Sequence, residues 1–508
     1  MTTQVDTLPD DTTTLKAMLH AERSAHAAET ERLRQIIREL QRHRFGRRAE
    51  SLPVDQLELA LEEVEQGEAA RAAGAERARP ARCVGPRRRN LGHLPAHLPR
   101  IEQVIDVEDK SCPCCRGPLH LVGEDVAERL DVVPAQFRVL VTRRPRYACR
   151  ACQEGVVQAP APARLIEAGL PTEALVAHVA IAKYADHCPL YRQAQIYGRQ
   201  GIDLDRSTLA DWVGRAAFLL RPVHARLLDK LKASSKLFAD ETTVPVLDPG
   251  RGRTKTGQLW AYARDERPWA GADPPGVVYV YATDRTASQP IKHLAGFQGV
   301  LQVDGYGGYR PLAETGLVRL AFCWAHVRRP FYELAAAGDA PIATQALERI
   351  KRLYAVEADI RGLAADRRVA ARQARSRPII EELEPWLRSR LAAVSRKGKM
   401  ADAIRYALAR WSGLTLFLHD GRIEIDSNVV ERSIRPIALT RKNALFAGSD
   451  GGAEHWAVLA SLIETCKLNG LDPETWLAGA ITRIVHGHPQ SRLDELLPWV
   501  QAPARAVA

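Results

Sequence analysis

Three acidic residues occur at positions that restrict how this chain can fold. Asp240 follows the apolar run KLFA, Asp304 closes the apolar run GVLQV, and Glu431 lies on a predicted helix far downstream. If the two runs are neighbouring strands of one sheet, their carboxylates come together. Carboxylate oxygens suit Mg²⁺, and two such ions about 3.5–4 Å apart stabilise the attacking and leaving oxygens of an in-line phosphoryl transfer. We therefore expect Asp240, Asp304 and Glu431 to bind Mg²⁺ or Mn²⁺.

Each of these assignments has an alternative. Asp240 and Glu241 are adjacent, so on a strand they point to opposite faces and only one can enter the site. Asp240 is preferred because it closes the apolar strand, and Glu241 is the fallback. Gly305 and the glycines after it would let the backbone turn close to a ligand. Glu431 could instead complete a capping box, with Asn428 as the N-cap and Glu431 at the third helical position.

Basic side chains near these carboxylates point to a polyanionic partner. The chain has a formal net charge of +11, and arginine pairs well with phosphate. We expect nucleic-acid contacts from four cations that follow Glu431, namely Arg432, Arg435, Arg441 and Lys442. In CWAHVRRPF (323–331), Trp324 could stack on an extruded base, while His326 and Arg328 could contact phosphate. The alternative is a buried Trp324 and a His326 with its hydrogen bonds satisfied.

Paired cysteines predict a small metal module. The spacing C-x2-C…C-x2-C suits a closed, structural zinc site with four thiolates, and its ligands would be Cys112, Cys115, Cys149 and Cys152. A redox dithiol is the alternative. The remaining isolated thiols, which include Cys323, are expected to be ordinary cysteines. The polar start MTTQVDTLPDDTTT does not predict a signal peptide and no apolar run is long enough to cross a bilayer, so we expect a cytoplasmic protein.

Periodicity along the chain predicts several domains. Residues 10–80 form a leucine-zipper-like helical segment, which is imperfect and could dimerise or dock as a lone helix. A basic linker (81–107) and the cysteine module (108–155) follow. The pattern of 165–235 suits a helix-turn-helix-like region in which Arg206 and Ser207 begin the second helix and contact DNA. Strand runs alternating with a helix then predict an α/β mixed sheet within residues 236–460, with a helical insertion at about 331–411 and a C-terminal helical segment at 461–502.

These motifs together resemble the IS66 family of bacterial insertion-sequence transposases, the large DDE-type protein of such elements. The resemblance runs nearly end to end, through CPCCRGPL with YACRAC, ADETTVPVL, QVDGYGGY, CWAHVRRPF and IDSNVVERSIRPIALTRKNALFAGSDGG. It implies a ribonuclease-H-like catalytic domain whose acidic triad falls on Asp240, Asp304 and Glu431. It also implies two small accessory proteins of the same element as partners.

The function expected from residues and resemblance is that of a DNA transposase. It would cleave double-stranded DNA at the element's ends and join the freed 3′-OH to target DNA, acting as a homo-oligomer on DNA, with Mg²⁺ and Zn²⁺ as cofactors. One alternative is a catalytically inactive DNA-binding regulator with the same fold, which would bind ends but never nick them. Another is a plain nuclease of the same fold, which would hydrolyse DNA without joining it.

Overall fold

The computed structural model describes Arg116 and residues 137–148, 156–167, 169–248, 251–338 and 340–500. The chain divides into two compact units, one of which is Ala70–Pro162 while the other includes everything from Ala163 onward. The leucine-zipper-like segment, the basic linker and the four predicted zinc ligands lie outside the described residues. Among the described helices, none combines the length and apolar content needed to cross a bilayer.

The described part of the smaller unit contains a short antiparallel hairpin. Strand β1 (Arg146–Ala148) pairs with β2 (Val156–Gln158). The pairing is extended by Arg144, whose Nε donates to the carbonyl oxygen of Ala159 at 2.9 Å. The alternating residues between the cysteine pairs predict two strands there. In the part of that segment that the structure describes, residues 137–145 are not in a strand, and β1 pairs with a strand that follows the second cysteine pair.

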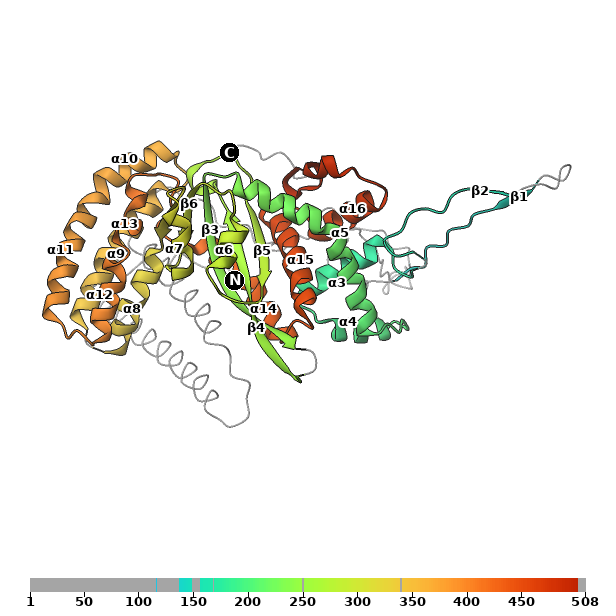
Figure 1. The fold of residues 1–508 in the computed structure, drawn as a ribbon, viewed down its shortest axis with the longest axis horizontal. Coiled ribbons are helices and arrows are strands. Elements are labelled where there is room, and N and C mark those ends of the chain that lie inside the picture. Colours follow the sequence, from blue (N-terminus) through green and yellow to red (C-terminus); the bar gives the residue numbers. More distant parts are fainter. Residues whose placement is uncertain are drawn as a thin grey trace. The chain divides into compact units, whose positions relative to one another are not determined.

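A five-stranded mixed sheet forms the centre of the larger unit (Figure 1). Its spatial order is β5-β4-β3-β6-β7, in which β3, β4 and β5 are antiparallel and β6 and β7 run parallel to β3. The strands are β3 (Lys236–Asp248), β4 (Arg253–Arg264), β5 (Gly276–Ala282), β6 (Gly299–Val303) and β7 (Val318–Phe322). The expected mixed α/β sheet is therefore confirmed, with strands where aromatic and β-branched residues are dense.

The β3–β4 hairpin is longer than the sequence suggested. Pairing continues from Phe238↔Ala263 out to Asp248↔Arg253, so the last four residues of DPGRGRTKT (248–256), a segment that the sequence suggests is a loop, belong to the second strand. Gly252, with φ +62°, allows the tight turn at the tip, because glycine adopts positive φ without steric cost. The hairpin arm is therefore a long two-stranded extension of the sheet.

Helices cover the β5 edge of the sheet. Helices α5 (Arg206–Lys232) and α15 (Asp450–Leu468) both contact β5. The Ser461 Oγ accepts a hydrogen bond from the Tyr279 N–H at 2.8 Å, and Thr465 Oγ1 both accepts from and donates to the Val277 backbone. These bonds satisfy an edge strand that would otherwise expose its backbone. The domain boundary that we expected at residue 460 falls inside α15.

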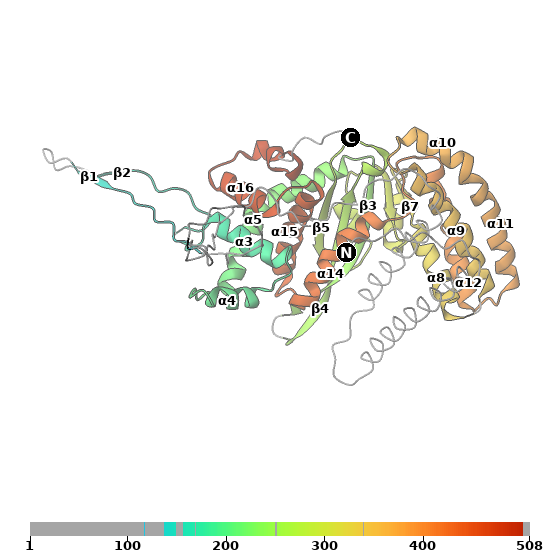
Figure 2. The ribbon, with the colours of Figure 1, turned by 180° about the vertical axis from the view of Figure 1, so that it is seen from behind.

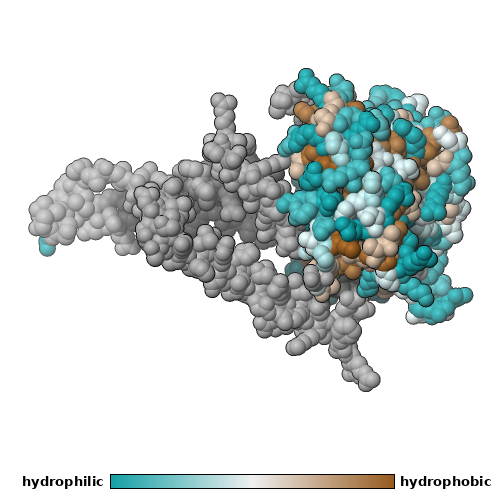
Figure 3. All heavy atoms as spheres, turned by 90° about the vertical axis from the view of Figure 1, so that its left-hand side faces the viewer, coloured by the Kyte–Doolittle hydropathy of each residue, from teal (hydrophilic) through white to brown (hydrophobic). Residues whose placement is uncertain are grey.

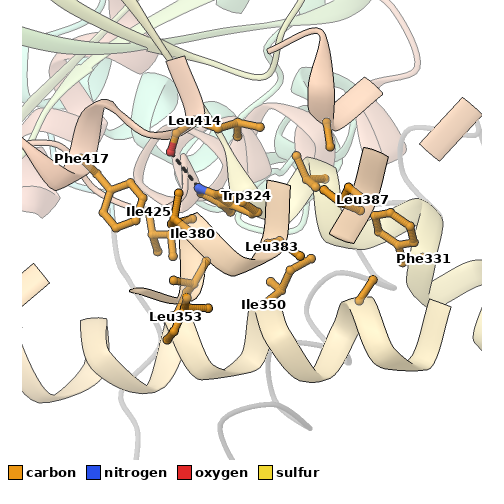
Figure 4. Packing of buried hydrophobic residues seen from close by; sticks show 14 of the residues in the cluster. Trp324, Phe331, Ile350, Leu353, Ile380, Leu383, Leu387, Leu414, Phe417 and Ile425 are labelled. Atoms are coloured by element: carbon orange, nitrogen blue, oxygen red, sulfur yellow. Dashed lines mark hydrogen bonds between the residues drawn. The ribbon is translucent and has the colours of Figure 1, made fainter. Parts of the chain in front are cut away.

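The opposite edge of the sheet carries a helical layer. It contains α8 (Trp324–Ala337), α9 (Pro341–Ile360), α10 (Ala365–Arg375), α11 (Arg377–Ala393), α12 (Lys399–Leu408) and α13 (Trp411–Leu414). Apolar side chains of α8, α9, α11, α12 and α13 form one core with Val300 of β6 and Ala321 of β7, and Trp324 lies inside it (Figure 4). Seen from the side of α10 and α11, the surface is mainly hydrophilic (Figure 3), as expected for amphipathic helices that bury one face.

The helices before the sheet include the predicted helix-turn-helix-like region. Helix α3 (Glu173–Tyr184) precedes α4 (Leu190–Gly198), and Gly201 follows with φ +76°. Helix α5 begins where expected, because the Asp205 side chain accepts from the Ser207 N–H at 2.7 Å and caps it. Near the C-terminus, α16 (Pro473–Val485) also begins as predicted, with Asp472 as its N-cap and proline at its first position.

Candidate catalytic site

Asp240 and Asp304 lie at matching positions on two neighbouring parallel strands. The ladder between β3 and β6 pairs Phe238 with Gln302, and each aspartate lies two residues further along its own strand. Residues two apart on a strand share a face, so the two carboxylates project from the same face as the Phe238–Gln302 pair. Gln302, fully buried, donates to the carbonyl oxygens of Glu424 and Asp426 at 2.8 and 2.9 Å. That face is therefore the one covered by the segment that leads into Glu431.

Glu431 comes to this face on α14 (Asn428–Ala444), which packs on β3 and β4 (Figure 2). The N-cap is Ser427 rather than Asn428, and the Ser427 side chain forms no capping bond. The Asn428 N–H instead donates to Asp426 Oδ1 at 3.3 Å. The capping-box alternative for Glu431 is therefore wrong. Its side chain, 8% exposed, instead accepts a hydrogen bond from Ser427 Oγ at 2.7 Å. The helix presents a buried carboxylate rather than a cap.

The pKa of Asp240 depends on the charges of the neighbouring carboxylates. Burial raises the pKa of Asp240 well above its ordinary value, and the charges of Glu241, Asp304 and Glu431 raise it further. Like charges gathered at one partly buried point disfavour ionisation. Such a cluster is stabilised when a cation binds, so the carboxylate chemistry of the three residues fits a hard divalent ion.

Glu241 faces a different set of partners. Its side chain is 0% exposed; it accepts from Arg285 Nε at 2.8 Å and from the Tyr309 hydroxyl at 2.7 Å. The Arg285 guanidinium also lies over the Tyr306 ring, 4.1 Å from its centroid. Because Glu241 is already paired with a cation, this geometry supports Asp240 as the strand residue of the site.

The loop after Asp304 is held by the helical layer. The Tyr406 hydroxyl donates to the Asp304 carbonyl oxygen at 2.6 Å, and Arg410 Nη2 donates to the Gly305 carbonyl oxygen at 3.1 Å. Gly305 has φ +110°, and a Cβ there would lie 2.4 Å from Arg410 Nε. We expected this glycine to make room for a ligand; in the structure it makes room for Arg410. Sequence reasoning missed both Tyr406 and Arg410, which have no local motif.

His326 lies beside Glu431 at the start of α8. Its Nδ1 is 3.8 Å from Glu431 Oε1. Burial alone would lower the pKa of His326, but the neighbouring Cys323, Glu431 and Asp304 together raise it well above its ordinary value. Cys323 was expected to be an isolated thiol, whereas it is the N-cap of α8 and part of this cluster. The C-x2-H spacing of Cys323 and His326 was the signal that could have identified it.

Two predicted nucleic-acid contacts are corrected by burial. Trp324 is 0% exposed and its Nε1 donates to the Leu414 carbonyl oxygen at 2.9 Å (Figure 4), so the ring is unavailable for base stacking. Arg441 is 6% exposed and donates to the backbone and hydroxyl of Thr243, which removes it from the DNA-facing set. Both side chains serve packing instead.

Five of the other seven predicted contacts are exposed. Arg432, Arg435 and Lys442 are exposed along the outer face of α14, and Arg206 and Ser207 are exposed at the start of α5. The Ser207 hydroxyl donates to its capping partner Asp205. Arg328 is partly buried, with its guanidinium 5.3 Å from the centre of the Tyr332 ring.

Comparison with known proteins covers most of the chain. The model of the Transposase IS66 family matches residues 168–455, and that of the IS66 C-terminal element matches residues 461–499. A zinc-finger binding domain of transposase IS66 matches residues 109–153, which supports Zn²⁺ at the cysteine module. The model described as Transposase C of IS166 homeodomain matches residues 32–102, within and beyond the leucine-zipper-like segment.

Two relatives align with this chain over most of its length. The uncharacterized protein y4qI of Sinorhizobium fredii is 46% identical over 540 residues, covering 98% of each chain. The uncharacterized protein y4jD of the same organism is 49% identical over 418 residues, covering 81% of this chain and 82% of its own. With family matches over both its sheet-containing unit and its cysteine module, the chain belongs to the IS66 transposase family.

Proposed function

We propose that this protein is a DNA transposase that cleaves the ends of its insertion sequence and joins the freed 3′-OH to target DNA. Asp240, Asp304 and Glu431 would hold Mg²⁺ or Mn²⁺. Two observations support the proposal. Asp240 and Asp304 follow paired positions of two neighbouring parallel strands, on the face covered by the segment that leads into Glu431. The charges of Asp304 and Glu431 both raise the pKa of Asp240.

The donor set supports this choice of metal. All three residues offer hard oxygen ligands, which Mg²⁺ prefers, and their mutual repulsion is relieved by a bound cation. Bound Mg²⁺ would supply positive charge to the attacking and leaving oxygens of an in-line displacement. Glu241, paired with Arg285, would remain outside the ligand set and support the strand from its other side.

Several residues would prepare the site for DNA. Ser427 orients the Glu431 carboxylate through its hydroxyl, and Tyr406 holds the Asp304 backbone. On the outer face of α14, Arg432 and Arg435 begin just after Glu431. Arginine binds phosphate oxygens in a bidentate manner, so this face would guide the DNA backbone towards the carboxylates.

The surrounding architecture is compatible with a ribonuclease-H-like catalytic domain interrupted by a helical insertion, which we propose for residues 236–460. The zinc module at 108–155 and the start of α5 would recognise the element's ends. A homo-oligomer on DNA and two small accessory proteins of the element complete the proposed assembly, with the protein acting on cytoplasmic DNA.

The decisive variant is Asp304→Asn, assayed on a labelled duplex carrying the inverted repeat that flanks the reading frame. We expect cleavage and strand transfer to be abolished while end-binding stays largely intact, because the amide keeps the side chain's shape but loses its charge. The matched control is Asp402→Asn, since Asp402 is an exposed carboxylate paired with Arg405 on α12, and this variant should cleave normally.

Three outcomes separate the alternatives. Cleavage that survives Asp304→Asn would show that the triad assignment is wrong. A wild-type protein that binds ends yet never nicks them with Mg²⁺ or Mn²⁺ would be an inactive DNA-binding regulator. A wild-type protein that hydrolyses the ends without joining them would be a nuclease.

A further inference from the structure

A second group of potential metal ligands shares Glu431 with the carboxylate site. Cys323 and His326 are one helical turn apart at the start of α8, and both face Glu431 of α14. One ligand atom from each of the three residues lies within 4.8 Å of the other two. Within the part of the chain that the structure describes, this is the group of such residues that combines sulfur, nitrogen and oxygen donors.

The cluster is held by a rigid frame. The Trp324 N–H donates to the Ile425 carbonyl oxygen at 2.9 Å, and the Ser427 N–H donates to Cys323 Sγ at 3.3 Å. Together they attach the start of α8 to the segment that precedes α14. Cys323 is 1% exposed and Glu431 8% exposed, so little movement is available to either side chain. Ligands fixed in this way lose little entropy when an ion binds.

One buried atom in the cluster lacks a partner. His326 Nδ1 is inaccessible to solvent and accepts or donates no hydrogen bond, although it lies 3.8 Å from Glu431 Oε1. Buried polar atoms without partners are rare in folded proteins, and an ion absent from the coordinates is one recognised explanation. An ion between Nδ1 and Oε1 would satisfy both atoms.

The donor types distinguish this cluster from the carboxylate site. A thiolate, an imidazole and a carboxylate are typical zinc ligands, whereas Mg²⁺ avoids sulfur. The zinc–ligand bond lengths of about 2.0–2.3 Å place tetrahedral ligand atoms about 3.3–3.8 Å apart. The observed separations, which are at most 4.8 Å, would need to shorten by up to about 1.5 Å. Rotation of His326, whose side chain is 25% exposed, can provide part of this change.

We propose that Cys323, His326 and Glu431 bind a zinc ion, separate from that of the cysteine module, with water at the fourth position. The ion takes Oε1 of Glu431, the oxygen that lies near Ser427 Oγ and His326 Nδ1. Binding releases the thiol proton of Cys323 and any proton on His326 Nδ1. The zinc would thus fix the orientation of the Glu431 side chain. Zinc binding does not depend on whether the protein cleaves DNA.

The test is the zinc content of the purified full-length chain, measured by mass spectrometry after dialysis against metal-free buffer. Wild type should retain two zinc ions per chain. Cys323→Ser and His326→Gln should each retain one, and the double variant Cys112→Ser/Cys323→Ser should retain none. Cys466→Ser is the matched control, because Cys466 is equally buried but lies in α15, and it should retain two.

Equal zinc content in wild type and Cys323→Ser would overturn the proposal, as would loss of one ion from Cys466→Ser. Circular dichroism identifies a variant that fails to fold. If a cysteine or histidine variant does so, the site is tested instead by adding Co²⁺ to the folded, zinc-depleted wild type. The proposal predicts two classes of thiolate-to-cobalt absorption in the wild type and the loss of one class in Glu431→Gln. A spectrum that Glu431→Gln leaves unchanged refutes the proposed site. A wild type with two zinc ions that fails to cleave DNA would refute the proposed function alone.

Discussion

Replacing Arg372 by Gln should destabilise the helical layer strongly, because this side chain uses all of its hydrogen-bonding capacity inside the protein. Arg372 is 0% exposed. Its Nε and Nη2 donate to the two carboxylate oxygens of Glu357 at 2.7 and 2.6 Å. Further bonds go to the carbonyl oxygens of Phe417, Asp420 and Ile423 at 2.9, 3.1 and 2.8 Å. A guanidinium has five N–H donors, and all five are used.

The magnitude follows from burial. Removing one partner of a buried ion pair costs about 3–5 kcal/mol, because the remaining charge and the three carbonyl oxygens lose their partner. Arg368, whose Nη2 lies 3.1 Å from Glu357 and 2.6 Å from Glu424, would still neutralise part of the charge. Domains are stable by about 5–15 kcal/mol, so the loss is a large share of the total.

The matched control is Arg375→Gln on the same helix. Arg375 pairs with Asp359 at 2.7 Å, but the two side chains are 48% and 44% exposed. Exposed pairs contribute about 0–1 kcal/mol. Arg372→Lys forms a second comparison, since it keeps the charge but offers only three donors and should fall between the two.

The assay is urea unfolding of the full-length chain, combined with hydrogen exchange of the amides of residues 417–427. Exchange reports local opening, which a single unfolding midpoint averages out in a protein of several domains. We expect faster exchange in this segment for Arg372→Gln and unchanged exchange for Arg375→Gln. If the two variants lose the same stability, the buried network makes no net contribution and the reasoning is refuted.

Three further variants test other features. Gly305→Ala should lower cleavage at least tenfold, because its Cβ would collide with Arg410 and displace the loop after Asp304; a fully active variant would contradict this. Burial lowers the pKa of Lys236 from 10.5 to about 7. Between these two pH values the unfolded chain therefore binds more protons than the folded chain. The free energy of unfolding should rise by on the order of 2 kcal/mol from pH 7 to pH 9. Lys236→Met should abolish that rise in urea melts at both pH values, and a persistent rise would assign it to other groups. Arg432→Gln/Arg435→Gln should reduce the slope of log binding constant against log salt by about two in filter-binding titrations; an unchanged slope would exclude this face from DNA contact.

The strands were predictable because their signal is local. Apolar, aromatic and β-branched residues are dense in runs such as GVVYVYA, the edge strand β5, and this pattern lies in consecutive residues. The starts of α5 and α16 were predictable for the same reason, since Asp205 and Asp472 cap helices by bonding to residues two or three positions away.

The exposure of the cations on α14 could also have been predicted from the sequence. Arg432, Arg435 and Lys442 recur at helical spacing on one face, whereas Arg441 falls on the opposite face with buried Ile437 and Ala438. The prediction that all four cations contact DNA did not take this periodicity into account. The helix period would have separated Arg441, which binds the strand at Thr243, from the three exposed residues.

Other features required the folded chain. The pairing of Asp240 with Asp304 depends on β3 lying between β4 and β6, and no local pattern encodes which strands become neighbours. Tyr406 and Arg410 come to the Asp304 loop from about one hundred residues away. The contact between Cys323 and Glu431 likewise joins two helices that are distant in the chain.

The amino-acid sequence was sufficient for the strands of the sheet, the caps of α5 and α16, the choice of three acidic candidates and the family, because each depends on residue types at short, regular spacing. Tertiary structure decided which side chains are available for chemistry. It buried Trp324 and Arg441, paired Glu241 with Arg285, and set Cys323 and His326 behind Glu431. The physical reason is that burial and long-range pairing depend on how sheet and helices pack, and packing is a property of the whole fold.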